Sequence, residues 1–163
     1  MKAAAHTREQ FEFIVAAPID AAWPLFGAQR ERDWAPDWHP DFVWPELAAD
    51  QQGMVFKIAR GEATAVWVNT CFDRTANRVQ YVYFIPETLV TVITLTLTQA
   101  GSRTRVEVSY ERTALTANAN DLVRQMAAHD KQAGAEWSAQ IDQYLRALRI
   151  GSADSLKPSP ANP

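Results

Sequence analysis

Cysteine is almost absent from this 163-residue chain, which contains Cys71 alone. One cysteine excludes an intrachain disulfide and a metal site built from several thiolates. Glycine is also scarce, and the six glycines do not form the glycine-rich loop that cradles a phosphate group. The three histidines have no spacing that matches a metal-binding motif such as HExxH. We therefore expect neither a structural or catalytic metal nor another cofactor.

Runs of basic residues are missing as well. The 16 lysines and arginines are scattered among 19 acidic residues, and the formal net charge is −3. This balance argues against binding to nucleic acid, whose phosphates need a basic surface. No apolar stretch approaches the roughly 20 residues of a membrane-spanning helix, and the first ten residues lack the apolar segment of a secretory signal. We expect a cytoplasmic protein without a membrane span.

Hydrophobic residues make up 47% of the chain, which is enough for the core of one domain. We expect residues 8–149 to form that domain. Residues 1–7 are predicted to be flexible. Residues 150–163 have lost the apolar content of the preceding segment, and we predict a disordered tail there.

Strand-like segments fill most of the domain. A first strand is predicted over residues 8–16, where aromatic and β-branched residues alternate with polar ones. Two short helical segments follow, one opened by Pro18 and limited by Pro24, the other over residues 27–33. From Gly53 onward, segments rich in valine, threonine and tyrosine alternate with short turn sequences, which predicts an antiparallel meander. Its predicted strands cover residues 54–60, 64–73, 79–85, 89–98 and 104–113.

Two of these strands indicate which face is buried. In the predicted strand over residues 89–98, Thr91, Ile93 and Leu95 share one face, and threonines lie on the other face. In the next strand, Val108 and Tyr110 share a face, opposite to glutamates and a serine. We predict that these residues point inward, where they could contact a ligand. The strand before them has apolar residues on both faces, which leaves a homodimer contact open.

A long helix is predicted over residues 118–148, with an apolar stripe that would lie across the concave face of the sheet. Met126, Ala133, Gly134 and Trp137 belong to this stripe. Because Ala133 and Gly134 are small, we expect a hollow beneath the helix at this level. This part of the helix is therefore predicted to roof a ligand cavity.

Asp130 is a carboxylate in the middle of this stripe. One hypothesis is that it gives the hollow a polar contact and, with its pKa raised by desolvation, acts as a general acid. The other is that it turns to solvent or pairs with an arginine such as Arg112, since most carboxylates escape full burial. His129 flanks the stripe and points away from Asp130, so we predict a half-exposed packing residue rather than a proton-transfer partner.

Three tryptophans and three prolines fall within residues 34–45. Prolines at this density argue against regular secondary structure. Trp34, Trp38 and Trp44 are too large to stay in water without a reason. They can form a wall or gate over the mouth of a cavity and stack on a flat apolar ligand. They can equally plug the end of the core, and a plug at the open end of a curved sheet is also a cavity wall.

Three segments carry a resemblance to a known superfamily. They are Phe11–Phe26, with Ala-Pro followed by a tryptophan at the entry to the first helix, the Trp34–Pro40 run, and Thr104–Leu115 as the last strand. Together with the order of elements over residues 8–148, they resemble the START-like superfamily (SRPBCC), which includes birch-pollen-allergen-like, polyketide cyclase/dehydratase and lipid-transport proteins. The resemblance implies an α+β helix-grip fold, in which a curved antiparallel sheet of about seven strands encloses a cavity with the long C-terminal helix. It does not specify a function, because one fold can serve many functions.

Three functions are consistent with these features. The preferred one is binding of a small hydrophobic or amphipathic molecule, a lipid or an aromatic polyketide-like compound. The second is an enzyme of the cyclase/dehydratase or hydrolase type, in which Asp130 or Tyr110 transfers a proton. The third is a protein-interaction module that uses a sheet edge or the tryptophan segment. The chain has no catalytic motif such as the G-x-S-x-G elbow of a hydrolase.

Overall fold

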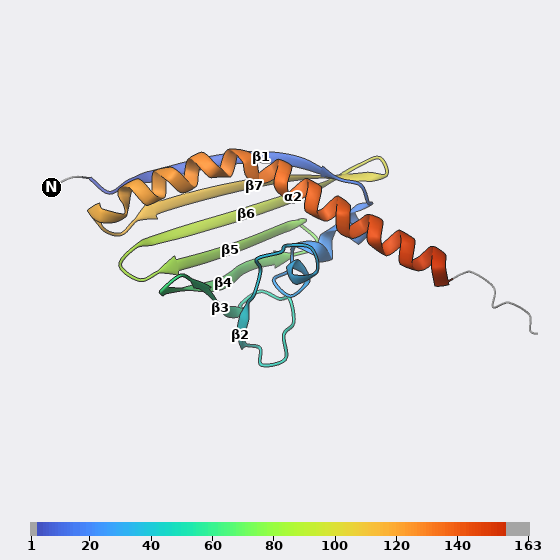
Figure 1. Ribbon diagram of the computed structural model, residues 1–163, viewed down its shortest axis with the longest axis horizontal. Helices are drawn as coiled ribbons and strands as arrows, with labels where there is room; N and C mark the ends of the chain where they lie inside the picture. Colours follow the sequence, from blue (N-terminus) through green and yellow to red (C-terminus); the bar gives the residue numbers. More distant parts are fainter. Residues whose placement is uncertain (1–2, 156–163) are drawn as a thin grey trace, which may run out of the picture.

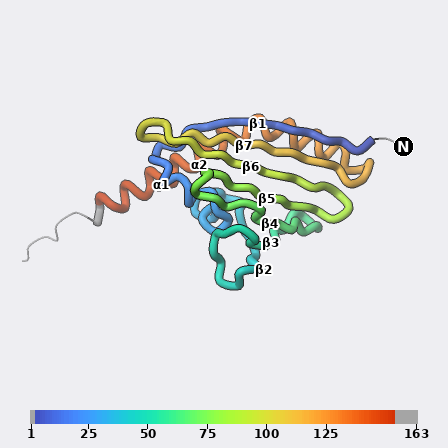
Figure 2. The backbone as a smooth tube through the Cα atoms, turned by 180° about the vertical axis from the view of Figure 1, so that it is seen from behind, coloured from blue at the N-terminus to red at the C-terminus, as the bar shows by residue number. Residues whose placement is uncertain are grey.

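Seven strands form one antiparallel sheet in the computed structural model, which describes residues 3–155. The order across the sheet is β1-β7-β6-β5-β4-β3-β2, so β1 and β2 are its two edges. Figure 1 shows the sheet as a curved layer with the long helix on one face, and Figure 2 shows it from behind. The strands are β1 (His6–Val15), β2 (Asp41–Trp44), β3 (Val55–Arg60), β4 (Ala63–Asp73), β5 (Arg78–Ile85), β6 (Leu89–Ala100) and β7 (Arg103–Ala114). The predicted helix-grip fold is confirmed.

Short helical segments connect β1 to the meander, as the sequence predicts. Pro18 is the N-cap of α1 (Ile19–Ala22), and Pro24 lies in the first turn of the 3-10 helix η1 (Trp23–Phe26). A proline is tolerated in a first turn because the N–H group it lacks would have no partner there. A second 3-10 helix, η2 (Arg30–Asp33), and the short η3 (Ala117–Ala119) complete the connections.

The C-terminal helix α2 (Asn120–Ser155) is longer than predicted. It begins slightly later than residue 118 and continues past residue 148. Residues 150–155, which we expected in a disordered tail, are therefore helical, and the remainder of that predicted tail lies outside the described residues. At the other end, β1 begins within the segment predicted to be flexible. Within residues 3–155, no helix is long and apolar enough to cross a membrane.

The edge strand β2 corrects the prediction that prolines exclude regular structure from residues 34–45. Pro40 and Pro45 flank this strand rather than interrupt it, and β2 pairs with β3. The pairing shifts register between Phe42 and Trp44. Prolines are tolerated at the ends of edge strands, where no further partner needs their N–H group. The sequence pattern missed this strand because it is short and exposed.

The predicted faces of β6 and β7 are confirmed. Ile93 and Leu95 on β6 and Val106 and Val108 on β7 are buried, whereas the intervening side chains are more exposed. This alternation places one side of each strand on the concave face of the sheet. The core of the domain therefore lies between this face, α2 and the short helices after β1.

Helix α2 does not cover the concave face evenly. It packs mainly on β1 and β7, the strands at one side of the sheet (Figure 1). Gly134 makes this close approach possible, since a Cβ atom at this position would lie 2.9 Å from Cδ2 of Phe11. The concave face of the central strands is consequently left without a helix directly on it.

Candidate functional site

A cavity of about 690 Å³ lies between α2, residues 31–38 and the concave face of strands β4 to β7. This volume falls within the range of about 300–1,000 Å³ that is typical of small-molecule sites. Leu122, His129 and Glu136 lie on its α2 side and are exposed, so the cavity is open to solvent along the helix. The uneven placement of α2 thus leaves a hollow of a size suited to one small ligand.

Most of the predicted site residues line this cavity, and the others lie elsewhere. The lining residues that the sequence predicted are Trp34, Trp38, Ile93, Tyr110, Met126, Asp130, Ala133 and Trp137. The remaining predicted residues are not among those that line it: Trp44, Thr91, Leu95, Val108 and Gly134. Thr91, Leu95 and Val108 do point inward, as predicted, but they are covered by the packing of the core.

Gly134 corrects the expectation that small residues on α2 leave a hollow beneath them. The ring of Phe11 on β1 fills the space under Gly134. The lack of a side chain at Gly134 therefore allows α2 to pack closely on the sheet. Ala133, its neighbour, does line the cavity. The hollow is therefore displaced from β1 toward the central strands.

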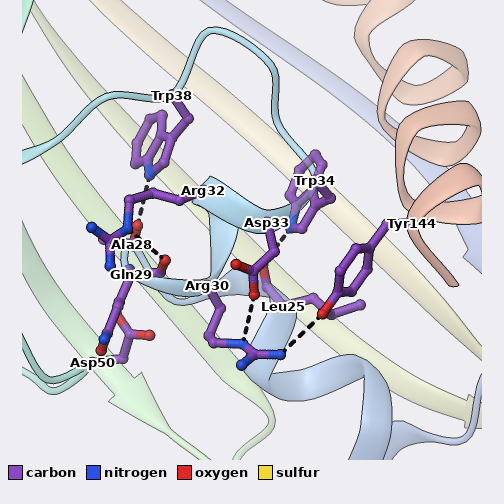
Figure 3. A network of polar contacts seen from close by, with 10 residues as sticks. All are labelled: Leu25, Ala28, Gln29, Arg30, Arg32, Asp33, Trp34, Trp38, Asp50 and Tyr144. Carbon is purple, nitrogen blue, oxygen red and sulfur yellow. Dashed lines mark hydrogen bonds and ion pairs between the residues drawn. The ribbon is translucent and has the colours of Figure 1, made fainter. Parts of the chain in front are cut away.

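Two of the three tryptophans in the proline-rich segment are held by hydrogen bonds to the main chain (Figure 3). The indole Nε1–H of Trp34 donates to the carbonyl oxygen of Leu25, and that of Trp38 donates to Ala28, each at 2.7 Å. Trp44 lies on the edge strand β2 and is 53% exposed. The segment therefore forms a fixed wall of the cavity with Trp34 and Trp38, while Trp44 faces solvent.

Aromatic rings form most of the apolar lining. Trp67 stacks on Tyr83 with ring centroids 4.3 Å apart, and Trp38 meets Trp67 edge-on at 5.2 Å. On the opposite side, Trp137 of α2 meets Trp34 edge-on at 5.7 Å. Such pairs fix the orientation of the rings. The cavity is thus bounded by indole and phenol groups that hold one another in place.

A buried ion pair joins the two sides of the cavity. The guanidinium of Arg112 on β7 makes a two-pronged contact with the carboxylate of Asp130 on α2, with Nη2 at 3.1 Å from Oδ1 and Nη1 bonded to Oδ2. Both side chains are buried and both residues line the cavity. The alternative in which Asp130 pairs with Arg112 is therefore the one that the structure realises.

The electrostatics of this pair affect both candidate proton-transfer groups. Burial raises the pKa of Asp130, and the hydrogen bond from Arg112 opposes the rise. Burial alone would lower the pKa of Arg112, but Asp130 and Tyr83 outweigh it and raise that pKa. Burial also raises the pKa of the Tyr110 phenol well above its usual value. The Arg112 guanidinium lies 4.5 Å from the centre of the Tyr110 ring, so the cation has a second contact there.

A row of polar residues, several of them with an unbonded polar atom, crosses the concave face of the sheet. Trp67, Tyr83, Thr91 and Arg112 are successive cross-strand neighbours on β4, β5, β6 and β7, and Thr7 extends the row onto β1. Within the described residues, the Nε1 atom of Trp67, the Oγ1 atoms of Thr91 and Thr7 and the Nε atom of Arg112 are buried without a hydrogen bond. Buried polar atoms usually have partners. Trp67, Tyr83 and Arg112 of this row line the cavity, so its floor includes unbonded polar atoms of Trp67 and Arg112, whereas Thr91 and Thr7 lie outside the lining.

Glu31 is a buried acidic residue of the cavity lining that the sequence pattern did not predict. It lies on η2, is 7% exposed and lines the cavity. Burial raises the pKa of its carboxyl well above the usual value, and the charge of Asp50 raises it further. The available signal was its spacing to Trp34, since residues three apart share a helical face.

Asp50 fixes η2 from the other side. Its Oδ1 atom accepts the Gln29 N–H at 2.9 Å (Figure 3). A Cβ atom on Gly27 would lie 2.1 Å from Oδ2 of Asp50, so only glycine leaves room for this carboxylate. Arg30 donates to the hydroxyl of Tyr144 at 3.2 Å, which links η2 to α2. These contacts hold the wall that carries Glu31 in one position.

His129 of α2 lines the cavity. The ring of His129 is largely exposed and lies 3.8 Å from the carboxylate of Glu136. Among the described residues, no group of three or more histidine, cysteine or acidic side chains could hold a metal ion. The site is therefore built mainly from aromatic rings, the buried pair of Arg112 and Asp130, and further acidic side chains that include Glu31.

Comparison with known proteins gives structural relatives only, since no protein-family model and no curated protein match the chain. Norcoclaurine synthase from Thalictrum flavum is 11% identical, with 87% of each chain covered and a TM-score of 0.65. The ZhuI aromatase/cyclase from Streptomyces sp. R1128 is 13% identical, with 90% of this chain and 98% of that chain covered and a TM-score of 0.65. A hypothetical protein from Helicobacter pylori is 11% identical, with 85% and 87% covered and a TM-score of 0.67. These likenesses establish the fold.

Proposed function

This chain has the helix-grip fold of the START-like (SRPBCC) superfamily, and we propose that it binds a small hydrophobic or amphipathic molecule in the cavity. The supporting observation is the cavity of about 690 Å³, walled by Trp34, Trp38, Trp67 and Trp137. Burial of apolar ligand surface against such rings contributes roughly 25 cal/mol per Å². The ligand class we propose is a lipid or an aromatic, polyketide-like compound.

The structural neighbours support the aromatic part of this class. One structure of norcoclaurine synthase was solved in complex with dopamine and hydroxybenzaldehyde, and another neighbour is an aromatase/cyclase. In our protein the indole rings offer flat surfaces to a flat ligand. The ion pair of Arg112 and Asp130 offers a polar contact at one end of the cavity. We infer that apolar burial provides the affinity and that these polar groups orient the ligand.

A catalytic role for Asp130 or Tyr110 remains the alternative, but the site favours it less. Asp130 is engaged by Arg112, and the raised pKa of Tyr110 keeps its proton on the phenol at neutral pH. The third function, a protein-interaction module, is also less favoured. Trp38 packs against Phe56 and Trp67 and donates to Ala28, so its ring is not free to dock a partner.

Native mass spectrometry of the purified protein, followed by a thermal-shift screen with lipids and aromatic compounds, tests the proposal. We expect a bound molecule, or a melting temperature that rises with ligand concentration. Ala133→Trp should abolish both, because Ala133 lines the cavity and an indole there would fill it. Ala128→Trp is the matched control, since Ala128 is exposed on α2. A chain that is empty and indifferent to the whole panel would contradict the proposal.

A further inference from the structure

Glu31 is a buried acid without a side-chain partner among residues 3–155. Its side chain lines the cavity and is 7% exposed together with the rest of the residue. Among the described residues, its carboxylate makes no hydrogen bond and no ion pair, and only the main chain of Glu31 is bonded. A buried carboxylate is normally paired, because leaving it unpaired is unfavourable. The unpaired group at the cavity wall therefore needs an explanation.

The protein holds this carboxyl at the wall. The Glu31 N–H donates to the carbonyl oxygen of Gly27 at 2.9 Å, and Trp34 N–H donates back to Glu31 at 3.2 Å. Asp50 and Tyr144 fix the neighbouring residues of η2. These contacts fix the backbone from which the Glu31 side chain extends to the cavity wall.

The charges around Glu31 favour a cation from outside the protein. The charge that raises the pKa of Glu31 beyond the effect of burial is that of Asp50, which is also acidic, and the titratable Tyr81 and Tyr110 lie within reach of the Glu31 charge. Of the two arginines that line the cavity, Arg112 is engaged by Asp130 and Arg60 is exposed. Without a ligand, burial keeps a proton on Glu31 to a higher pH than usual. Glu31 is therefore an acid at the cavity wall without a cationic partner among the described residues.

We propose that Glu31 binds the protonated amine of an aromatic ligand. This inference rests on the proposed function, because it names the charged group of the ligand in the same cavity. Trp34 and Trp38 follow Glu31 in the sequence and line the cavity with it, and indole faces attract cations. A carboxylate among indole rings is the arrangement that recognises an ammonium group. The chemical class of the ligand is therefore an aromatic or polycyclic amine.

Two probes of the same shape test this assignment. Naphthylmethylamine is a cation at neutral pH, and naphthylmethanol is its neutral counterpart. We expect the wild-type protein to bind the amine about 10- to 100-fold more tightly, the range for one charge-assisted hydrogen bond. Glu31→Gln should abolish this preference and leave the affinity for the alcohol unchanged. Asp33→Asn is the control, since Asp33 carries the same charge on η2 but does not line the cavity.

A second measurement uses the wild-type protein alone. Calorimetry at pH 6 in two buffers of different ionisation enthalpy gives the number of protons released on binding. We expect the amine to release protons from Glu31 and the alcohol to release none. Equal affinity for both probes, or an amine preference that survives Glu31→Gln, would overturn the assignment while leaving the proposed function intact. Binding of neither probe would also overturn it, and the proposed function would then be judged by the co-purified ligand.

Discussion

Arg112 of β7 and Asp130 of α2 form a buried ion pair that joins the sheet to the long helix across the cavity. Asp130→Asn should lower the free energy of unfolding by about 3–5 kcal/mol, because it leaves the Arg112 charge buried without a partner. The double variant Arg112→Met/Asp130→Leu should recover most of this loss, since it removes both charges. Urea denaturation of the double variant and of its single variants Arg112→Met and Asp130→Leu, alongside Asp130→Asn, gives the coupling energy. Independent, additive losses would show that the pair does not act as a unit.

Gly134 is predicted to be intolerant of a side chain. Gly134→Ala should destabilise the protein by about 1–3 kcal/mol, the usual cost of overpacking, because the ring of Phe11 is held by other aromatic rings and cannot move aside. Gly151→Ala is the matched control in the same helix, since a Cβ atom there would meet nothing within 4 Å. That variant should be neutral or stabilising by up to about 1 kcal/mol through helix propensity. Thermal denaturation distinguishes the two, and equal effects would contradict the close contact.

The fold could be predicted from the sequence where each strand shows a clear alternation. Ile93 and Leu95 on β6 and Val108 on β7 were assigned to the correct face because two-residue periodicity survives in every packed strand. The edge strand β2 was missed, since an exposed strand has no apolar face to reveal it. The end of α2 was also missed, because its last turns extend beyond the sheet (Figure 1), where periodicity carries no signal. A sequence pattern arises where one face of an element is buried, so an element without a buried face shows no such pattern.

The pH dependence of stability should carry the signature of Glu31. Burial raises its pKa in the folded state above the usual value of about 4.3. At a pH between the Glu31 pKa of the unfolded chain and the higher Glu31 pKa of the folded chain, the unfolded chain has lost the proton that the folded chain keeps. The free energy of unfolding therefore falls as pH rises through this range. Glu31→Gln should remove this loss, and its stability relative to wild type should therefore increase from pH 5 to pH 8. Asp50, whose pKa burial also raises, is present in both proteins, so it contributes to the difference only through its charge interaction with Glu31. A difference that stays constant with pH would contradict the prediction.

Thr91 offers a test of the row of buried polar atoms without hydrogen bonds on the concave face of the sheet. Its hydroxyl is buried without a hydrogen bond, and its side chain has the shape of valine. Thr91→Val should stabilise the protein by about 1 kcal/mol, because a desolvated polar group is removed without a change in packing. Chemical denaturation gives the value. A clear loss of stability would instead indicate that the hydroxyl has a partner, such as a bound water molecule.

The candidate site could be predicted only in part, for a physical reason. Periodicity on α2 identified Asp130 and Trp137, and strand alternation identified Tyr110, because each lies on a regular element. Glu31 and Trp67 were missed as site residues. Whether a side chain on a short helix or a buried strand meets a neighbour or a hollow depends on how distant elements pack, and no local pattern encodes that. Trp44 was predicted as a ligand-binding residue but is exposed, since the aromatic character of its segment does not tell which ring faces inward.

The position of α2 on one side of the sheet also affects how quickly a ligand can exchange with solvent. The helix is fixed to β1 and β7, so its displacement would break the core. The opposite wall, residues 31–38, is held by a few side-chain hydrogen bonds, among them those of Trp34, Trp38 and Arg30. Local opening of such a segment needs less free energy than global unfolding. Because the cavity is also open to solvent along α2, entry and exit should need neither displacement of the helix nor global unfolding, and the residence time of a ligand should be independent of the overall stability of the domain.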